Sequence, residues 1–353
     1  MALRVLPGGA MEKRFDPWTI DETAFPHGAP PAEVFRFLLQ YAVLAPSSHN
    51  TQPWRFRLGG DRLELHADPT RALPVADPQR RELVISCGAA LFHLRLALRH
   101  FHYAGDVECL PDPYQPGLLA RIGLGRREAA PADDRLFRAI QHRHTHRGAF
   151  DSEIVFESVT DTIQSAARQE GAWFQPITTP EARHAVAHLV AEADLILLGN
   201  KQYRAELANW IRPNLSAEAD GIPGYALGLN DITASLAPLW LRFHDTSVPT
   251  SHRDAELVRQ APLLGVLGTP NDTLADWLAA GQALAHVLLQ ARVHGVHAGF
   301  HNQPVEVPAF RTRLAGVLHR PGLPQVLLRF GHAPEGRPTP RRAVSDVLEV
   351  SRS

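Results

Sequence analysis

Cysteine is scarce in this 353-residue chain, and its scarcity excludes two kinds of site. Cys87 and Cys109 are too few for a disulfide framework, and they lack the paired spacing used for structural zinc or thiol redox chemistry. Cys87 falls on the apolar face of a predicted helix, where a small core residue is expected. We therefore expect a cytoplasmic protein without disulfides.

Net charge and long apolar runs are lacking too. The formal charge is -1, so no basic field exists to hold nucleic acid or an anionic membrane surface. We find no signal peptide and no run as long as a membrane span, and we expect a protein that is neither exported nor anchored. Lys13 and Lys201 are the only lysines, so arginine carries nearly all the positive charge. Arginine binds phosphate through two parallel hydrogen bonds.

What the chain does have is a polar stretch at residues 45–54, which reads Ala-Pro-Ser-Ser-His-Asn-Thr-Gln-Pro-Trp. Apolar residues recur at helical spacing over 34–44, and Pro46 ends that helix because it disfavours the helical conformation at the residue before it. Residues 54–58 then alternate apolar side chains with arginine, as a half-buried strand does. The loop between them is either a capping and turn cluster or a binding site.

A second polar segment begins at Arg143. In extended backbone Arg143, Thr145 and Arg147 share one face, because successive side chains of a strand point to opposite sides. Two guanidinium groups and a hydroxyl on one face indicate a site for an anionic ligand.

Histidines offer a competing interpretation. His142, His144 and His146 alternate, and a second group follows residue 293. Neither group comes with cysteine or carboxylate ligands at a familiar zinc spacing, so no metal site is predicted.

The chain also contains an internal repeat. Residues 88–96 correspond to residues 281–289, with Gly88 matching Gly281. The first copy belongs to a long apolar helix predicted at residues 81–100, which is expected to lie in the core. These observations predict an N-terminal arm at 1–31, a first half at 32–140 and a second half at 141–353.

Taken together, these segments resemble the nitroreductase family of FMN-dependent oxidoreductases, and the pattern after about Phe35 is similar to its Acg subfamily. The family loop Pro-Ser-Ser-x-Asn-x-Gln-Pro-Trp matches residues 46–54. The family opening Arg-x-Ser-x-Arg resembles residues 143–147, where Thr145 stands in place of the serine, and a C-terminal basic pair matches residues 341–342. The resemblance implies that FMN is bound by Pro46, Ser47, Ser48, Asn50, Gln52, Arg143, His144, Thr145, Arg147, Arg341 and Arg342. It implies no catalytic side chain, because the flavin carries the chemistry.

The resemblance also implies an architecture. The expected fold is α+β, a nitroreductase-like three-layer α/β/α sandwich with a mixed central sheet. In that family two subunits of a homodimer supply the two walls of each flavin site. Here the first half keeps the loop wall and the second half keeps the arginine wall. The chain therefore resembles a fused dimer, or pseudo-dimer, with one composite site, and we expect a monomer or weak homo-oligomer.

The implied function is an NAD(P)H-dependent oxidoreductase that passes hydride through flavin N5 to a nitroaromatic, a quinone or a similar small acceptor. No Gly-x-Gly-x-x-Gly follows a strand, so NAD(P)H is expected to be a visiting substrate. Residues 211–260 are too long for a turn and too apolar for a linker, and we expect a helical lid insertion that folds over the flavin. A lid that stays closed leaves an alternative: a flavin-binding storage or sensor protein with little or no reductase turnover.

Overall fold

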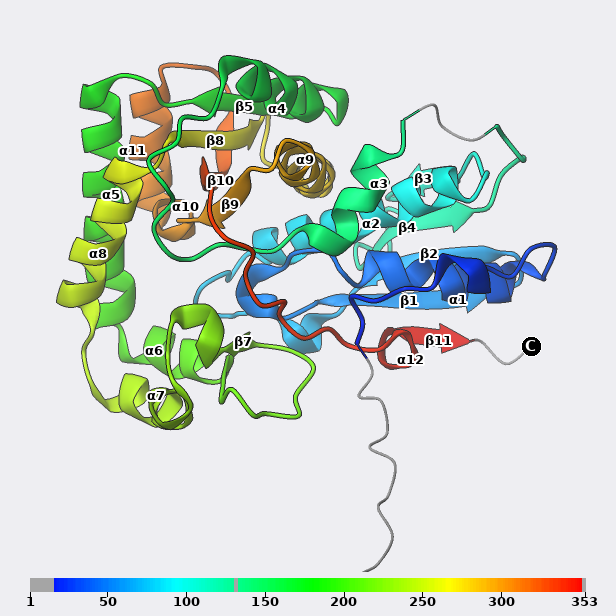
Figure 1. Ribbon diagram of the computed structural model, residues 1–353, viewed down its shortest axis with the longest axis horizontal. Helices are drawn as coiled ribbons and strands as arrows, with labels where there is room; N and C mark the ends of the chain where they lie inside the picture. Colours follow the sequence, from blue (N-terminus) through cyan, green and yellow to red (C-terminus); the bar gives the residue numbers. More distant parts are fainter. Residues whose placement is uncertain (1–15, 130–132, 351–353) are drawn as a thin grey trace, which may run out of the picture.

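The computed structural model describes residues 16–129 and 133–350 (Figure 1). Of the predicted arm, residues 1–15 lie outside this described part. From Asp16 onward the arm packs on the first half: Trp18 is buried, and Phe25 stacks on Phe101 with ring centroids 4.1 Å apart. The described part of the arm is thus wrapped onto the core.

The first half contains, in chain order, α1 (Pro31–Ala42), β1 (Trp54–Gly59), β2 (Arg62–Ala67), α2 (Arg81–His100), β3 (Asp106–Cys109), β4 (Leu118–Gly123) and α3 (Arg135–Ala139). The second half contains α4 (Glu157–Gln169), β5 (Trp173–Pro176), α5 (Pro180–Gly199), α6 (Lys201–Ala208), β6 (Ile211–Arg212), β7 (Ile222–Pro223), α7 (Asp231–Phe243), α8 (Ser247–Gln260), β8 (Leu263–Thr269), α9 (Leu274–Val293), β9 (His297–Phe300), α10 (Gln303–Glu306), α11 (Pro308–Leu318), β10 (Leu323–Gly331), α12 (Val344–Val347) and β11 (Leu348–Val350).

One sheet belongs mainly to the first half and has the strand order β11-β1-β2-β4-β3. In β1 the side chains of Trp54, Phe56 and Leu58 are buried while Arg57 is exposed, which confirms the alternation predicted from sequence. β1 and β2 form an antiparallel pair. Cys87 is buried beneath this sheet, where its thiol donates to the Pro53 carbonyl at 3.3 Å. It is a core residue, as expected.

The second sheet has the order β5-β8-β10-β9 and is antiparallel throughout. All seven residues of β8 are buried, which explains why its sequence is continuously apolar instead of alternating.

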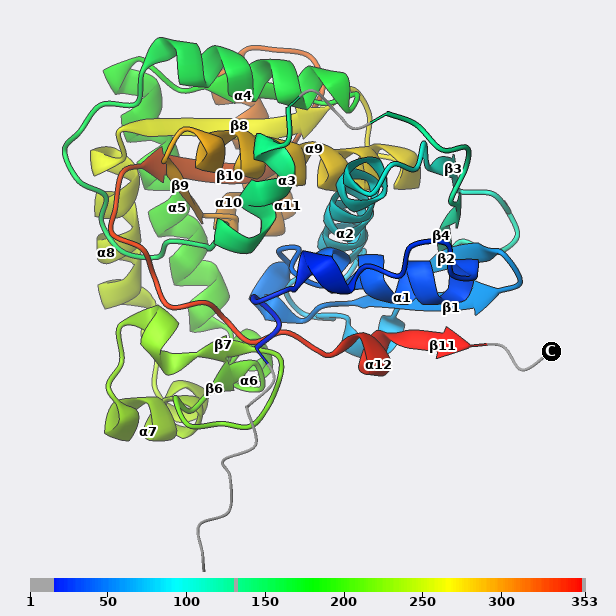
Figure 2. The same ribbon diagram turned by 45° about the vertical axis from the view of Figure 1, so that its right-hand side comes forward.

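The expectation of a mixed central sheet needs correction, because the described residues form two main sheets and the first of these is the mixed one. After β10 the chain crosses from the second half to the first, and β11 then pairs in parallel with β1 (Figures 1 and 2). Residues 332–343 form the connection from β10 of the second sheet to α12 and β11 at the first sheet. The C-terminal segment thereby ties the two halves together.

Helices α2 and α9 pack against each other along the middle of the molecule, and they carry the two copies of the sequence repeat (Figure 2). Gly88 and Gly281, the matched glycines, meet at this crossing. A Cβ atom on Gly88 would lie 2.9 Å from the Cα of Gly281 and closer still to the Leu278 carbonyl. The two backbones approach so closely that glycine is required on both helices.

By length and composition α2 could span a membrane, which corrects the expectation that no stretch of the chain reaches that length. In this structure 78% of its most apolar window is buried. Most of the helix is buried because α1, α9 and the first sheet pack around it.

The predicted lid insertion, residues 211–260, consists of the β6 and β7 pair followed by α7 and α8. Helix α8 packs along α5, and α7 packs on α6 (Figure 1). The segment is mostly helical, as predicted, and Figure 1 shows α6, α7 and β7 grouped at one end of the molecule. Its position over a cavity is described next.

Candidate functional site

The loop between α1 and β1 has an unusual backbone. His49, Asn50 and Gln52 have φ angles of 52°, 56° and 51°, in the left-handed region that side chains rarely adopt. Each such residue costs on the order of 1 kcal/mol, so contacts must hold the loop in place. Ser47 provides two of them: its hydroxyl accepts from the Gln52 amide at 2.9 Å, and its carbonyl accepts from the Asn50 amide at 3.0 Å.

A cavity of about 580 Å³ lies between this loop and the second half. Residues of both predicted segments line it: Pro46, Ser47, Ser48 and His49 from the loop, and Thr145 and Arg147 from the second segment. The second segment is anchored by β9, because Thr145 forms a bridge with Ala298 and the His146 amide donates to the Ala298 carbonyl at 2.8 Å. Two stretches about a hundred residues apart thus face one cavity.

Three arginines cluster behind and beside this cavity. Arg143 and Arg341 are buried, and both guanidinium groups donate to the Leu44 carbonyl, at 3.3 and 3.4 Å. Burial, followed by the neighbouring positive charges, lowers the pKa of Arg143 to about 10 and that of Arg341 well below its usual value. Burial also lowers the pKa of Arg147 to about 10.

No carboxylate among the described residues pairs with any of these three arginines. The Nε atoms of Arg143 and Arg341 are also buried without a hydrogen-bond partner. Uncompensated buried charge is costly, so a cluster of this kind is suited to an anion supplied from outside. Trp18 of the arm closes the cluster, with the Arg341 guanidinium 4.8 Å from its ring centroid.

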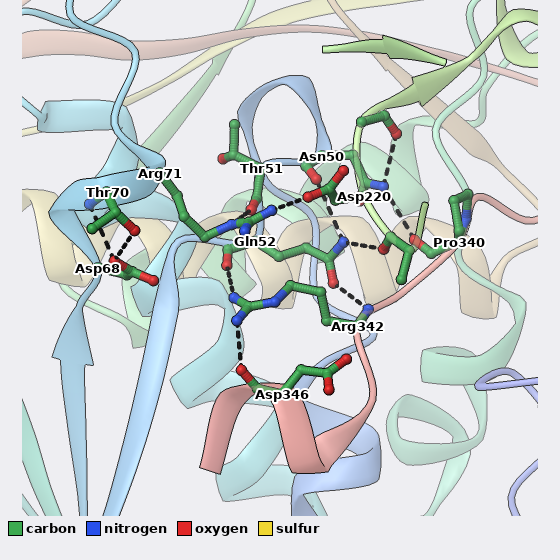
Figure 3. Close-up of polar contacts among 12 residues, drawn as sticks. Asn50, Thr51, Gln52, Asp68, Thr70, Arg71, Asp220, Pro340, Arg342 and Asp346 are labelled. Atoms are coloured by element: carbon green, nitrogen blue, oxygen red, sulfur yellow. Dashed lines mark hydrogen bonds and ion pairs between the residues drawn. The ribbon is translucent and has the colours of Figure 1, made fainter. Parts of the chain in front are cut away.

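Six of the sequence-predicted residues do not line the cavity: Asn50, Gln52, Arg143, His144, Arg341 and Arg342. Asn50 holds other parts of the chain instead (Figure 3). Its amide nitrogen donates to the Gly221 carbonyl at 2.9 Å and to the Pro340 carbonyl at 3.1 Å, while its oxygen accepts from Arg341 at 2.9 Å. Asn50 therefore positions Arg341.

Gln52 and Arg342 are engaged with each other. The Gln52 side chain accepts from the Arg342 amide at 2.8 Å and donates to the Ala219 carbonyl at 2.8 Å. The Arg342 guanidinium donates to the Gln52 carbonyl at 3.1 Å and to the Asp346 carbonyl at 2.6 Å (Figure 3). Both side chains fasten the C-terminal segment to the loop.

The same network fixes the start of the lid insertion. Asp220 pairs with Arg71 on one side and with Arg212 on the other, the latter at 2.7 Å. Arg71 also donates to the Thr51 carbonyl at 2.5 Å (Figure 3). Residues 219–221 are thus bound directly to the loop that lines the cavity.

Two histidines lie close to the arginines. His49 lines the cavity, its Nε2 has no partner, and burial, followed by the charge of Arg147, lowers its pKa to about 4. His144 packs edge-on against Trp18, with centroids 4.6 Å apart, and burial followed by the charge of Arg143 lowers its pKa to about 3. Both imidazoles are neutral at neutral pH. Across residues 16–129 and 133–350, no group of three or more His, Cys, Asp or Glu side chains could hold a metal ion.

The far end of the cavity is acidic and was missed by the sequence reasoning. Its carboxyl groups belong to Glu82, Asp194, Asp254 and Glu306. Glu82 accepts from the Ser48 hydroxyl at 2.6 Å, which links this end to the loop. The clearest signal in the sequence was Asp194, a lone charge within the apolar stripe of α5.

The lid insertion also lines this part of the cavity, through residues that include Ile211, Ile222, Leu227, Trp240 and Leu241. Trp240 is 51% exposed and faces the cavity in part. The lid insertion therefore forms an apolar wall above the acidic end.

Comparison with known proteins gives relatives over nearly the whole chain, although no family model matches. A Mycobacterium tuberculosis protein provisionally named NAD(P)H nitroreductase Rv3131 is 33% identical over 325 residues, which cover 91% of this chain and 92% of that one. The provisionally named NAD(P)H nitroreductase acg from the same organism is 29% identical, over 90% of this chain and 96% of that one.

Solved structures show weaker similarity. An FMN-dependent nitroreductase, NfnB from Mycobacterium smegmatis in complex with NADPH, is 17% identical with a TM-score of 0.41, over 62% of this chain and 98% of that one. A nitroreductase with bound FMN from Desulfitobacterium hafniense is 14% identical with a TM-score of 0.39, over 62% and 98% of the two chains.

Proposed function

The chain belongs to the nitroreductase family, and from that premise we propose that it binds FMN between its two halves and oxidises NAD(P)H to reduce a small acceptor such as a nitroaromatic or a quinone. One observation carries the proposal: the Pro46–His49 loop and the Thr145–Arg147 segment, from opposite halves, line a single cavity.

The residues present fit FMN. Its phosphate is an anion, and the arginine cluster of Arg143, Arg147 and Arg341 has buried donors without partners and no carboxylate to neutralise it. A hydrogen bond between charged groups contributes about 1.5–3 kcal/mol before desolvation costs. The hydroxyls of Ser47 and Thr145 add neutral donors on the two sides of the cavity.

When bound, FMN would supply hydride transfer between a nicotinamide and an acceptor. The residues of this chain would hold and shield it. Arg147 would keep a fixed positive charge at the cavity, and the apolar lid insertion would exclude water from it. A side-chain acid or base is not required for this role.

We further assign the chain as a fused dimer that has kept one composite site. The supporting observation is the crossing of α2 and α9, where the matched glycines Gly88 and Gly281 touch. A fused dimer should be a monomer that binds one FMN. Size-exclusion chromatography with light scattering, combined with flavin absorbance, measures both quantities, and a chain that binds FMN only after self-association would contradict the assignment.

A second function, a flavin store or sensor, is favoured by the lid insertion. Residues 219–221 are bound to the loop through Asn50, Gln52 and Arg71, and α7 covers the cavity. If these contacts persist, NAD(P)H cannot reach the site, and turnover would be slow or absent.

One experiment tests both functions. The protein is purified, its flavin is released and identified, and NADH or NADPH is then mixed anaerobically with the FMN-loaded protein in a stopped-flow instrument. Rapid bleaching of the flavin absorbance supports the oxidoreductase. Bound FMN that stays oxidised supports the store, and a protein that binds no FMN contradicts both.

A further inference from the structure

The acidic end of the cavity contains more carboxyl groups than the protein pairs with cations. Glu82 is paired with Arg81 at 3.1 Å and Asp254 with Arg253 at 3.0 Å. Asp194 and Glu306 form no ion pair within the described part of the chain, and both line the cavity; the charges of Arg253 and Arg81, which pair with Asp254 and Glu82, reach them only from a distance. Two carboxyl groups in one place therefore lack an ion-pair partner of their own.

Asp194 is the more telling of the two. Its side chain is only 2% exposed, it faces the cavity, and its Oδ2 atom has no hydrogen-bond partner. A buried carboxylate oxygen normally finds a donor, because leaving it unpaired costs several kcal/mol. An unpaired oxygen directed at a cavity points to a donor that arrives with a ligand.

Tyr203 of α6 shows that these groups converge. Its hydroxyl donates to Glu306 at 3.3 Å, and after burial the charges of Glu306, Asp194 and Glu82 raise its pKa well above the usual value. Three carboxyl groups from three helices therefore surround one phenol. Burial, followed by the charge of Asp254, also raises the pKa of Asp194 to about 7, and the smaller opposing effects of the Gln303 side chain and of Arg253 do not offset this rise.

The walls around this acidic end include many apolar side chains beside the polar Gln303 and Arg253. Leu198 and Leu207 lie on the helices that carry Asp194 and Tyr203, and Ile211, Trp240 and Leu241 come from the lid insertion. A hydrated metal ion does not suit such walls, and no group able to hold a metal is present among the described residues. The surroundings instead suit an organic cation with an apolar body.

We propose that Asp194 and Glu306 bind the protonated amine of an otherwise apolar organic molecule, whose body lies against the lid insertion. The ammonium group would donate to the carboxyl group of Glu306 and to that of Asp194, whose Oδ2 atom is unpaired. The amine site does not depend on the proposed function. Only the further assignment of this molecule as the electron acceptor rests on it.

Isothermal titration calorimetry with a matched set of probes tests the proposal. Tryptamine, tryptophol and indole-3-acetate share an indole ring and differ in charge, and each is titrated at neutral pH into the protein as purified, after its flavin content has been measured. We expect tryptamine to bind at least about tenfold more tightly than tryptophol, and indole-3-acetate to bind most weakly.

Two variants and one control locate the site. Asp194→Asn and Glu306→Gln should each weaken tryptamine binding about tenfold and leave tryptophol binding unchanged. Glu192→Gln is the control, because Glu192 lies on the same helix as Asp194 but pairs with Arg313, away from the cavity.

Equal binding of tryptamine and tryptophol by the unmodified protein would overturn the proposal without recourse to any variant. An amine preference that survives in both variants would overturn it as well. The result also distinguishes the amine site from the proposed function. A protein that binds no FMN but still prefers the amine would contradict only the proposed function. A protein that binds FMN without preferring the amine would contradict only the amine site.

Discussion

The two ends of the cavity are built from opposite charges. At one end the buried arginines Arg143 and Arg341 lie behind Arg147 and form no ion pair with a carboxylate of the described residues; at the other, Asp194 and Glu306 form no ion pair with a cation of those residues. Each end would be unfavourable alone, because buried charge without a partner is costly. The contrast fits the two proposals made above, an anion at one end and a cation at the other.

The largest expected effect concerns the acidic end and its dependence on pH. The pKa of Asp194 is raised to about 7 from an ordinary 3.8, so the folded protein holds this proton more tightly than the unfolded chain. Stability contributed by the proton is complete below about pH 4 and is lost as pH rises towards 7. The loss is at most about 4 kcal/mol, at 1.36 kcal/mol for each pKa unit.

Asp194→Asn should remove that loss and make the protein more stable than the original at about pH 8, with little difference at about pH 4. Urea unfolding at several pH values measures this. Asp161→Asn, at an exposed position of α4, is the matched control. A variant that is less stable than the original at every pH would show that Asp194 has a favourable partner.

The arginine end is tested by Arg341→Ala, which should weaken FMN binding about a hundredfold, or about 2.7 kcal/mol, because a charged hydrogen-bond donor is lost. Titration of flavin-stripped protein, followed by quenching of FMN fluorescence, gives the dissociation constant. Arg342→Ala is the control and should change it by less than about threefold, since Arg342 is engaged with Gln52 and Asp346. An equal effect of both substitutions would contradict the assignment of the cluster.

The crossing of α2 and α9 holds part of the cavity in place, because α2 also carries Glu82 of the acidic end. Gly88→Ala should lower the free energy of unfolding by about 1–3 kcal/mol, since the added methyl group would overlap the backbone of α9. Gly316→Ala, in a helix with open space around it, should instead be neutral or slightly stabilising. Thermal unfolding compares the two, and a tolerated Gly88→Ala would mean that the helices can separate.

The smallest expected effect concerns the contact between the lid insertion and the loop. Asp220→Ala leaves Arg71 and Arg212 without their shared partner and should destabilise the lid insertion locally by about 1 kcal/mol. Hydrogen exchange of residues 211–223 should become faster, and bleaching by NAD(P)H should become faster too. Glu218→Ala, exposed in the same loop, is the control. Unchanged exchange in the Asp220 variant would show that other contacts hold this segment.

The two ends also differed in how far sequence could predict them. The arginine end was found because Arg143, Thr145 and Arg147 are close together in sequence and alternate as a strand requires. The acidic end could not be found in that way, since Glu82, Asp194, Asp254 and Glu306 come from four helices, α2, α5, α8 and α10. Spacing within one segment carries no information about convergence of distant helices.

For the loop, the sequence predicted the backbone elements better than the contacts of its side chains. The helix at 81–100 and the strand after the loop were predicted and are confirmed, and residues 211–260 are mostly helical; that they act as a lid remains a prediction. Asn50 and Gln52 were predicted to face the ligand, but their partners are the backbone of residues 219–221 and the C-terminal segment. Those partners lie about 170 to 290 residues away, and amide side chains give no local signal of which distant backbone they will bind.

A crystal structure of the protein grown with FMN would show directly whether one FMN is held between segments from opposite halves. We expect a flavin in the cavity that contacts both the Pro46–His49 loop and the Thr145–Arg147 segment, with its phosphate hydrogen-bonded to arginines of the cluster. A flavin bound elsewhere, or in contact with one half alone, would contradict it.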